Sequence, residues 1–209
     1  MESSIKIKQI KCLEGLHYSF DLLQFNYNNL YEKCISIQSN PENLMSALTQ
    51  CWFIADLVHR IREISQVIGL SQADPNLKNF LNKTKIAEDY RHYIQHLRQE
   101  LTKRDLNLFP VWGTLSWVDP VDSNNTYIAV VGSRIKNTKY PSCTYDTKNR
   151  KWVSKVCLSI DNISFDFDHI YEVTMTFKDF IIKWIKSNHD LEINKTPDIP
   201  ILKVGIFWK

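Results

Sequence analysis

The sequence predicts an α+β fold, in which an N-terminal α-helical bundle is followed by a β-rich C-terminal unit that contains one helix. Two observations lead to this prediction. Apolar residues recur at helical spacing through the first half of the chain, and the pattern becomes strand-like after Pro110. The change of pattern predicts two domains, residues 1–108 and residues 109–209.

Four helical segments are expected before Pro110, each from its apolar periodicity and its flanking Pro, Gly or Asp residues. They cover residues 13–37, 42–68, 74–81 and 84–106. Strands and polar turns then alternate. Residues 111–118 and 126–135 are predicted to form one hairpin, and residues 143–145 and 151–160 a second. A helix over residues 176–187 and a final strand over residues 201–208 complete the prediction.

The composition is that of an ordinary globular protein. The chain has 209 residues, of which 44% are hydrophobic and 23% charged, with a net charge of +3. These values suit a packed core and do not by themselves indicate nucleic-acid binding. No apolar run approaches the roughly 20 residues of a membrane span, and the N-terminus lacks the apolar stretch of a signal peptide. We therefore expect a cytoplasmic protein with no membrane contact.

The five cysteines are odd in number and widely spaced along the chain: Cys12, Cys34, Cys51, Cys143 and Cys157. None of them belongs to a closely spaced Cys or Cys/His pair of the kind that binds structural zinc. The pattern predicts reduced thiols, as in a cytosolic protein. We expect neither a metal site nor a cofactor.

The segment over residues 84–106 carries the most informative pattern. At about 100° per residue, a narrow sector of this helix collects apolar residues and is predicted to be its buried stripe: Tyr90, Ile94, Leu97 and Leu101. The opposite face is polar, and its members are Glu88, Arg91, His92, Gln95, His96 and Gln99. One helix would therefore present a polar surface opposite a side that belongs to the core.

Histidine and arginine on one face suit phosphate chemistry. Histidine takes or gives a proton near neutral pH, and arginine binds a phosphate and stabilises the charge that develops on it. Together they could let a ribose 2′-hydroxyl attack its own phosphodiester without a metal. The same pattern also fits a solvated helix face, on which His92 pairs with Glu88, or binds a stray metal ion with His96.

A second polar cluster lies on the predicted helix over residues 42–68. Asp56 and Arg60 are four residues apart, as are His59 and Glu63. This spacing is typical of exposed ion pairs on a helix. The alternative is a set of residues that faces the substrate or supports the site.

The segment Arg91-His92-Tyr93-Ile94-Gln95-His96 resembles the Arg-x4-6-His motif of HEPN domains (higher eukaryotes and prokaryotes nucleotide-binding). Its place on the last long helix of a four-helix half also fits that family, which consists of bundles of four or five helices. The resemblance covers residues 10–108 and leaves the C-terminal half unassigned. Position 92 departs from the family pattern: the residue after the arginine is polar and usually Asn in the family, and here it is His.

The resemblance implies a metal-independent endoribonuclease, often the toxin of a toxin–antitoxin or phage-defence system. It also implies a homodimer in which two motif helices meet at one cleft, with RNA as substrate and an antitoxin or another regulatory protein as a further partner. Arg91 would stabilise the phosphate, His96 would be the general acid or base, and His92 would take the usual polar position. Gln95, Glu88 and Gln99 would bind the substrate.

Two other functions compete with RNA cleavage. Some HEPN domains are inactive, so the chain could be a binding or dimerisation module for RNA, a nucleotide or a protein. Alternatively, it could be a structural dimer whose aromatic C-terminal half recognises a ligand. Aromatic residues of that half could stack on bases, although in strands they more often belong to the core: Trp112, Trp117, Trp152, Tyr140 and Tyr145.

Overall fold

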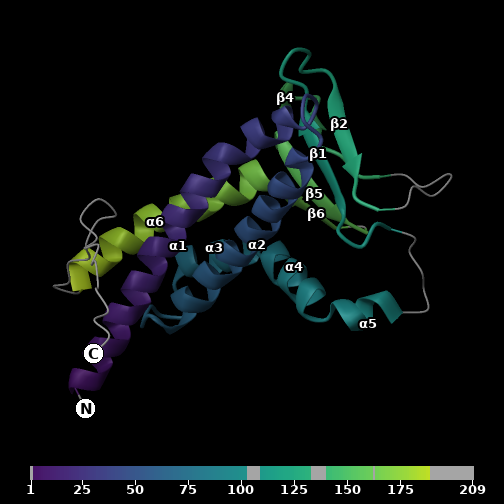
Figure 1. The fold of residues 1–209 in the computed structure, drawn as a ribbon. Helices are drawn as coiled ribbons and strands as arrows, with labels where there is room; N and C mark the ends of the chain where they lie inside the picture. Colours follow the sequence, from purple (N-terminus) through teal and green to yellow (C-terminus); the bar gives the residue numbers. More distant parts are fainter. Residues whose placement is uncertain (1, 103–108, 133–139, 162, 189–209) are drawn as a thin grey trace, which may run out of the picture.

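The structure is a computed structural model that describes residues 2–102, 109–132, 140–161 and 163–188, with side chains from Ile7 onward. Within these ranges, helices dominate the first half, a small antiparallel sheet follows, and a long helix ends the described chain (Figure 1). This arrangement confirms the predicted α+β class. The strand predicted over residues 201–208 lies outside the described residues. No described helix has both the length and the apolarity that a membrane span requires.

A long helical hairpin forms the frame of the molecule. It consists of α1 (Glu2–Ser36) and α2 (Asn43–Val67), which contact each other along their length. Apolar residues predicted for the inner faces are buried, such as Leu16 and Leu23 on α1 and Val58 and Ile61 on α2. Helix α1 begins earlier than predicted. Its first turns were missed because Lys and Ile alternate before Leu13 and form no stripe of helical period.

Helix α3 (Pro75–Lys83) begins at a cap that the sequence indicates. Asp74 accepts hydrogen bonds from the backbone N–H groups of Asn76 (2.8 Å) and Leu77 (3.1 Å), and Pro75 occupies the first turn. These contacts satisfy amide groups that have no partner inside the helix, and proline needs none at this position. The predicted third helix is therefore confirmed.

The prediction of one continuous fourth helix over residues 84–106 is wrong, because two shorter helices occupy this part of the chain. Helix α4 (Ile86–Gln95) ends where His96 leaves helical geometry, with φ −107° and ψ 23°, and α5 (Leu97–Thr102) then runs in a new direction (Figure 1). Leu101, predicted to be buried, is 51% exposed, and no described residue of α5 is buried. Because α5 reaches no core, nothing holds it in line with α4.

The main sheet has the strand order β2-β1-β5-β6, and all its pairs are antiparallel. Its strands are β1 (Thr114–Val118), β2 (Thr126–Val130), β5 (Val156–Ile160) and β6 (Ile163–Asp166). The first predicted hairpin is confirmed, since β1 pairs with β2. The second is corrected: residues 151–160 are divided between β4 (Lys151–Trp152), which pairs with β3 (Tyr145–Asp146), and β5, which pairs with β1.

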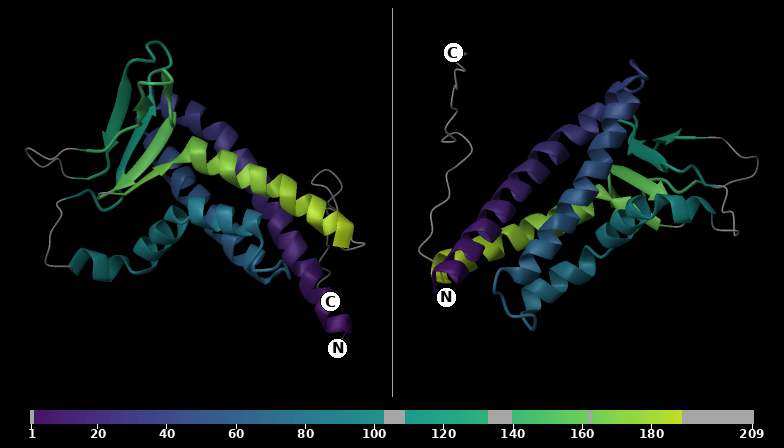
Figure 2. Two further views of the ribbon diagram at one scale, coloured as in Figure 1. Left: turned by 180° about the vertical axis from the view of Figure 1, so that it is seen from behind. Right: turned by 60° about the horizontal axis from the view of Figure 1, so that its bottom comes forward.

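Helix α6 (Phe167–Asn188) runs antiparallel to α1 and completes the helical layer (Figure 2). Tyr27 donates a hydrogen bond of 2.5 Å to Asp168 and stacks on Tyr171, with 3.7 Å between ring centroids. Further along, Lys178 lies 3.5 Å from Asp21. The prediction placed the start of this helix nine residues too late, because Phe and Asp alternate over residues 165–168 in the manner of a strand.

The two halves of the chain share one hydrophobic core. Leu115, Leu158 and Phe165 lie on the inner face of the sheet and join the cluster that α1 and α2 form. On the opposite face of the sheet, Ser116 lies beside Cys157 in the register. The boundary after residue 108 thus marks a change of secondary structure within a common core, to which the C-terminal helix α6 also contributes.

Candidate functional site

Helix α4, which carries the predicted motif, is anchored at its centre by Tyr90. This side chain is fully buried, and its hydroxyl donates hydrogen bonds to the backbone carbonyls of Leu158 and Ile163 (3.3 Å to the latter). Burial raises the pKa of Tyr90 well above its ordinary value, so the hydroxyl stays a donor. The motif therefore lies on a helix that is fastened to the sheet.

Arg91 is held by two neighbours. Its Nη1 lies 2.8 Å from Oδ1 of Asp56 on α2, whose other oxygen accepts from Arg60 at 2.6 Å. The side-chain amide of Gln95, one turn further along α4, lies beside Arg91; with its oxygen turned toward the guanidinium, it accepts from Nε at 3.0 Å and from Nη2 at 3.1 Å. Arg91 is 33% exposed. These contacts fix the guanidinium at the surface between α2 and α4.

The second cluster expected from the sequence does form the predicted ion pairs on α2, Asp56 with Arg60 and His59 with Glu63 (3.4 Å). The additional contact from Asp56 to Arg91 joins this cluster to the motif. Sequence spacing could not reveal that contact, because the two residues are 35 positions apart and lie on different helices.

Glu88, predicted to bind substrate, is engaged by the fold, whereas the side chain of Gln99, for which the same role was predicted, is exposed. Glu88 forms an ion pair of 2.5 Å with Arg62, which is only 4% exposed and also donates to Thr84 (2.7 Å) and to the Leu81 carbonyl. Gln99 lies beyond the helix break, where its backbone N–H donates to the His96 carbonyl at 2.8 Å. The substrate-binding role of both residues stays a prediction.

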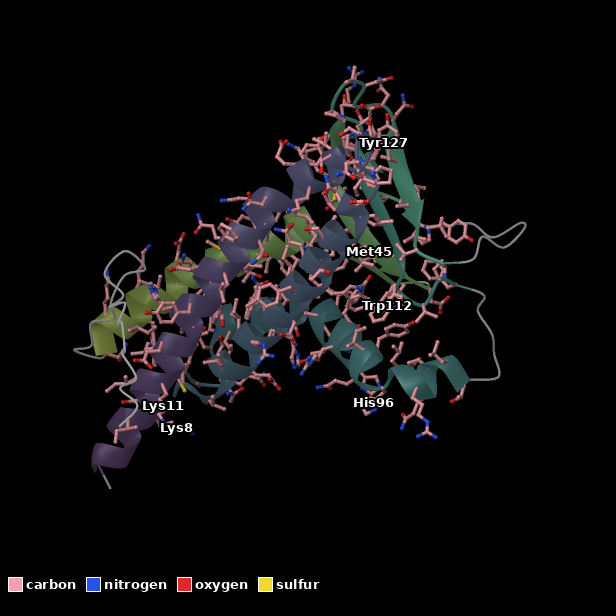
Figure 3. The ribbon with its side chains drawn as sticks, in the orientation of Figure 1. Lys8, Lys11, Met45, His96, Trp112 and Tyr127 are labelled. Atoms are coloured by element: carbon pink, nitrogen blue, oxygen red, sulfur yellow. The ribbon has the colours of Figure 1, made fainter. Side chains whose placement is uncertain are left out.

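The two histidines of the motif lie against each other. The ring centroids of His92 and His96 are 4.4 Å apart, at an interplanar angle of 45°. His92 is exposed and His96 half-buried. In Figure 3, His96 lies at the junction of α4 and α5 and projects away from the sheet. Neither ring contributes to the hydrophobic core.

The predicted site residues thus form an arc across α4. Arg91 contacts Gln95 at one end of the arc, and His92 contacts His96 at the other. The arginine and the histidine pair therefore lie at opposite ends of the arc.

A cavity beside Arg91 was not predicted from the sequence. It has a volume of about 490 Å³ and lies between α2, α4 and the segment over residues 109–132. Its walls are mostly apolar and include Met45, Trp52, Phe53, Tyr90, Ile94 and Trp112. Several of these residues were assigned to core stripes or strands, and only tertiary packing shows that they line a common space.

Comparisons of the chain with protein-family models, curated proteins and solved structures find no match. The resemblance to HEPN domains therefore rests on the Arg-x4-His segment and its helical context. Among the residues that the structure describes, no three His, Cys, Asp or Glu side chains are grouped so that they could hold a metal ion.

Proposed function

We propose that this protein is a metal-independent endoribonuclease of the HEPN type that acts as a homodimer. The observation that carries the proposal is the arc on α4, in which two adjacent imidazoles lie on the same helix as a fixed arginine. His92 is exposed and His96 half-buried, so both imidazoles can be reached from solvent. The resemblance suggests a toxin of a toxin–antitoxin or phage-defence system as the biological setting.

The proposed reaction needs two proton transfers and one cationic group that stabilises the charge on the phosphate. A base removes the proton of the ribose 2′-hydroxyl, the oxygen attacks the adjacent phosphorus, and an acid protonates the leaving 5′-oxygen. His96 is the proposed acid or base, and His92 is the neighbouring group that can exchange the second proton. The products are a 2′,3′-cyclic phosphate and a 5′-hydroxyl end.

Arg91 is suited to clamp the phosphate in spite of its existing contacts. Asp56 forms an ion pair with Nη1, and Gln95 lies beside Nε and Nη2. A guanidinium has five N–H groups, so N–H groups remain to donate to the non-bridging oxygens, whose charge grows during the attack. Asp56 lies between Arg60 and Arg91, so the local charge remains positive.

The separation of Arg91 from the histidine pair supports a site that is shared between two subunits. Because Arg91 lies at one end of the arc and His96 at the other, one phosphodiester would meet them together more readily in a two-fold dimer. There, Arg91 of one subunit would lie near His96 of the other. Cross-linking or light scattering should then detect a dimer at the concentration at which cleavage is assayed.

The decisive experiment follows the ends of cleaved RNA. Purified protein is incubated with labelled single-stranded RNA and with DNA of the same sequence, with and without a chelator. We expect chelator-resistant cleavage of RNA alone, with 2′,3′-cyclic phosphate ends. Cleavage of DNA, or activity that disappears with the chelator, would refute the mechanism.

One observation favours a second candidate, a non-catalytic RNA-binding module. Arg91 is already held by Asp56 and Gln95, and position 92 lacks the Asn that is usual in HEPN domains. Such a protein would bind RNA through the same face and leave it intact. The RNA assay separates the two functions when binding is measured beside cleavage.

A further inference from the structure

The cavity next to Arg91 shares residues with the proposed catalytic helix. Tyr90 and Ile94 of α4 form part of its wall, and Arg91 both lines the cavity and begins the polar arc. A molecule that binds in the cavity would therefore lie beside the guanidinium. In Figure 3, Trp112 lies on the side of α4 that faces the sheet, whereas His96 projects from the other side.

The cavity walls offer aromatic surface for a planar ring. Trp52 and Trp112 both line the cavity and meet at 85°, with 6.3 Å between their ring centroids. Trp112 is 45% exposed, and Met45 and Phe53 at the same cavity are also exposed. A volume of about 490 Å³ lies within the range of small-ligand sites.

The polar groups around the cavity match a nucleotide. Asp56 lines the cavity and pairs with both Arg91 and Arg60. These three side chains together carry a net positive charge, which suits a phosphate. An apolar body with a cationic rim thus fits a base and its attached phosphate.

We propose that this cavity binds one unstacked nucleobase of the RNA while the adjacent phosphate contacts Arg91. The inference rests on the proposed function for its choice of RNA, and it extends that function by assigning a base subsite. Aromatic side chains commonly hold unstacked bases of single-stranded RNA in this way. The cavity would then position the scissile phosphate relative to the histidines.

The test measures binding separately from cleavage. A labelled single-stranded RNA is titrated onto the 209-residue His96→Ala protein, alone and combined with Trp112→Ala, Trp112→Phe or Thr49→Trp. Thr49 is exposed and lines the cavity, so a tryptophan there should fill the opening without disturbing the core. Phe25→Ala is the matched control, because Phe25 is 67% exposed on α1 and does not line this cavity. Thermal unfolding confirms that each variant is folded.

We expect Trp112→Ala and Thr49→Trp to weaken RNA binding by about tenfold or more, a typical size for the loss of one stacked base. Trp112→Phe and Phe25→Ala should bind almost as tightly as the parent protein. An RNA with one abasic position should lose a similar factor on the parent protein and little on Trp112→Ala, because the same contact is then already absent.

The outcomes distinguish the two proposals. Binding that depends on Trp112 in a protein that cuts no RNA would support the base subsite and refute the ribonuclease. Cleavage by the wild-type protein, with RNA binding unchanged in Trp112→Ala and Thr49→Trp, would refute the subsite alone. A folded wild-type protein that binds no RNA would overturn both.

Discussion

Two arginines connect α4 to α2, and their burial differs sharply. Arg62 is 4% exposed and is surrounded by Glu88, Thr84 and the Leu81 carbonyl. Arg91 is 33% exposed and meets Asp56 at the surface. A buried guanidinium cannot be solvated when its partners are removed, whereas an exposed one can. Arg62 therefore serves the fold, and Arg91 remains accessible to a ligand.

Replacement of Arg62 by Ala should lower the free energy of unfolding by about 3 kcal/mol, since it removes one side of a buried polar network. Arg60→Ala is the matched control, because Arg60 is 54% exposed in its pair with Asp56 and should change stability by less than about 1 kcal/mol. Urea unfolding measures both. An equal effect of the two substitutions would show that the Arg62 network adds nothing to stability.

His96→Ala should reduce RNA cleavage by about a hundredfold or more, which is typical when a proton-transfer group is lost. His92→Asn should have a smaller effect, because it restores the residue that is usual in the resembled family. His169→Ala is the control, since His169 is exposed on α6 and outside the arc. Full activity of His96→Ala would remove this residue from the mechanism.

Arg91 needs a more careful substitution than Ala, because it also fastens α4 to Asp56. Arg91→Lys keeps a positive charge near Asp56 but loses the forked donors that hold a phosphate. We expect a cleavage loss of about a hundredfold with a small change in thermal stability. If Arg91→Lys lost cleavage activity and thermal stability in proportion, Arg91 would act only by stabilising the fold.

Helices with a continuous apolar stripe were the elements that the sequence predicted best. The stripes of α1 and α2 repeat over many turns, so both elements were identified. The division of residues 84–106 at His96 was missed, because its apolar positions continue in register although α5 reaches no core. The start of α6 was missed for a related reason, since Phe165 and Phe167 alternate with Asp as strand residues do.

Tyr90 joins α4 to the strands through its hydroxyl. Removal of that hydroxyl therefore tests how much the contact between the helix and the sheet contributes to stability. Tyr90→Phe should lower the free energy of unfolding by about 1 to 2 kcal/mol, because it removes the hydrogen bonds to the Leu158 and Ile163 carbonyls without changing the shape of the ring. Tyr127→Phe is the control, since Tyr127 donates to Asp119 at the surface. Chemical denaturation of both variants decides the point.

One core unites residues that the sequence assigned to two domains. The motif residues were identifiable in advance because they lie within six positions on one helix. Their environment was not, since Asp56, Trp52 and Trp112 come from α2 and from the segment that precedes β1. Contacts between distant segments leave no periodic trace in a single sequence.

The shared core and a smaller buried cluster around Val118 contain thiols that should make the protein sensitive to alkali. Burial raises the pKa of Cys34 and of Cys143 to about 12, from an ordinary value of 9.0, and it raises that of Cys51 as well. The folded state therefore keeps protons that the unfolded state releases above about pH 9. This contribution to stability is complete below pH 9 and is lost as the pH rises toward 12.

We therefore expect the free energy of unfolding to fall between pH 9 and pH 11, as measured by urea denaturation at each pH. Cys34→Ala should flatten that fall, although it also removes packing. In the native protein at pH 8, a thiol reagent should modify Cys12, which is half-exposed, much faster than the four buried cysteines. Equal reaction of all five would contradict the buried core.

The pairing of α1 with α6 has a consequence for synthesis on the ribosome. Tyr27 meets Asp168 across 141 positions of sequence, and Asp21 meets Lys178 across 157. At ordinary elongation rates, roughly ten seconds or more pass between the emergence of these partners. During that interval the nascent α1–α2 hairpin exposes the apolar face that α6 later covers, which makes it a natural substrate for chaperones that act cotranslationally.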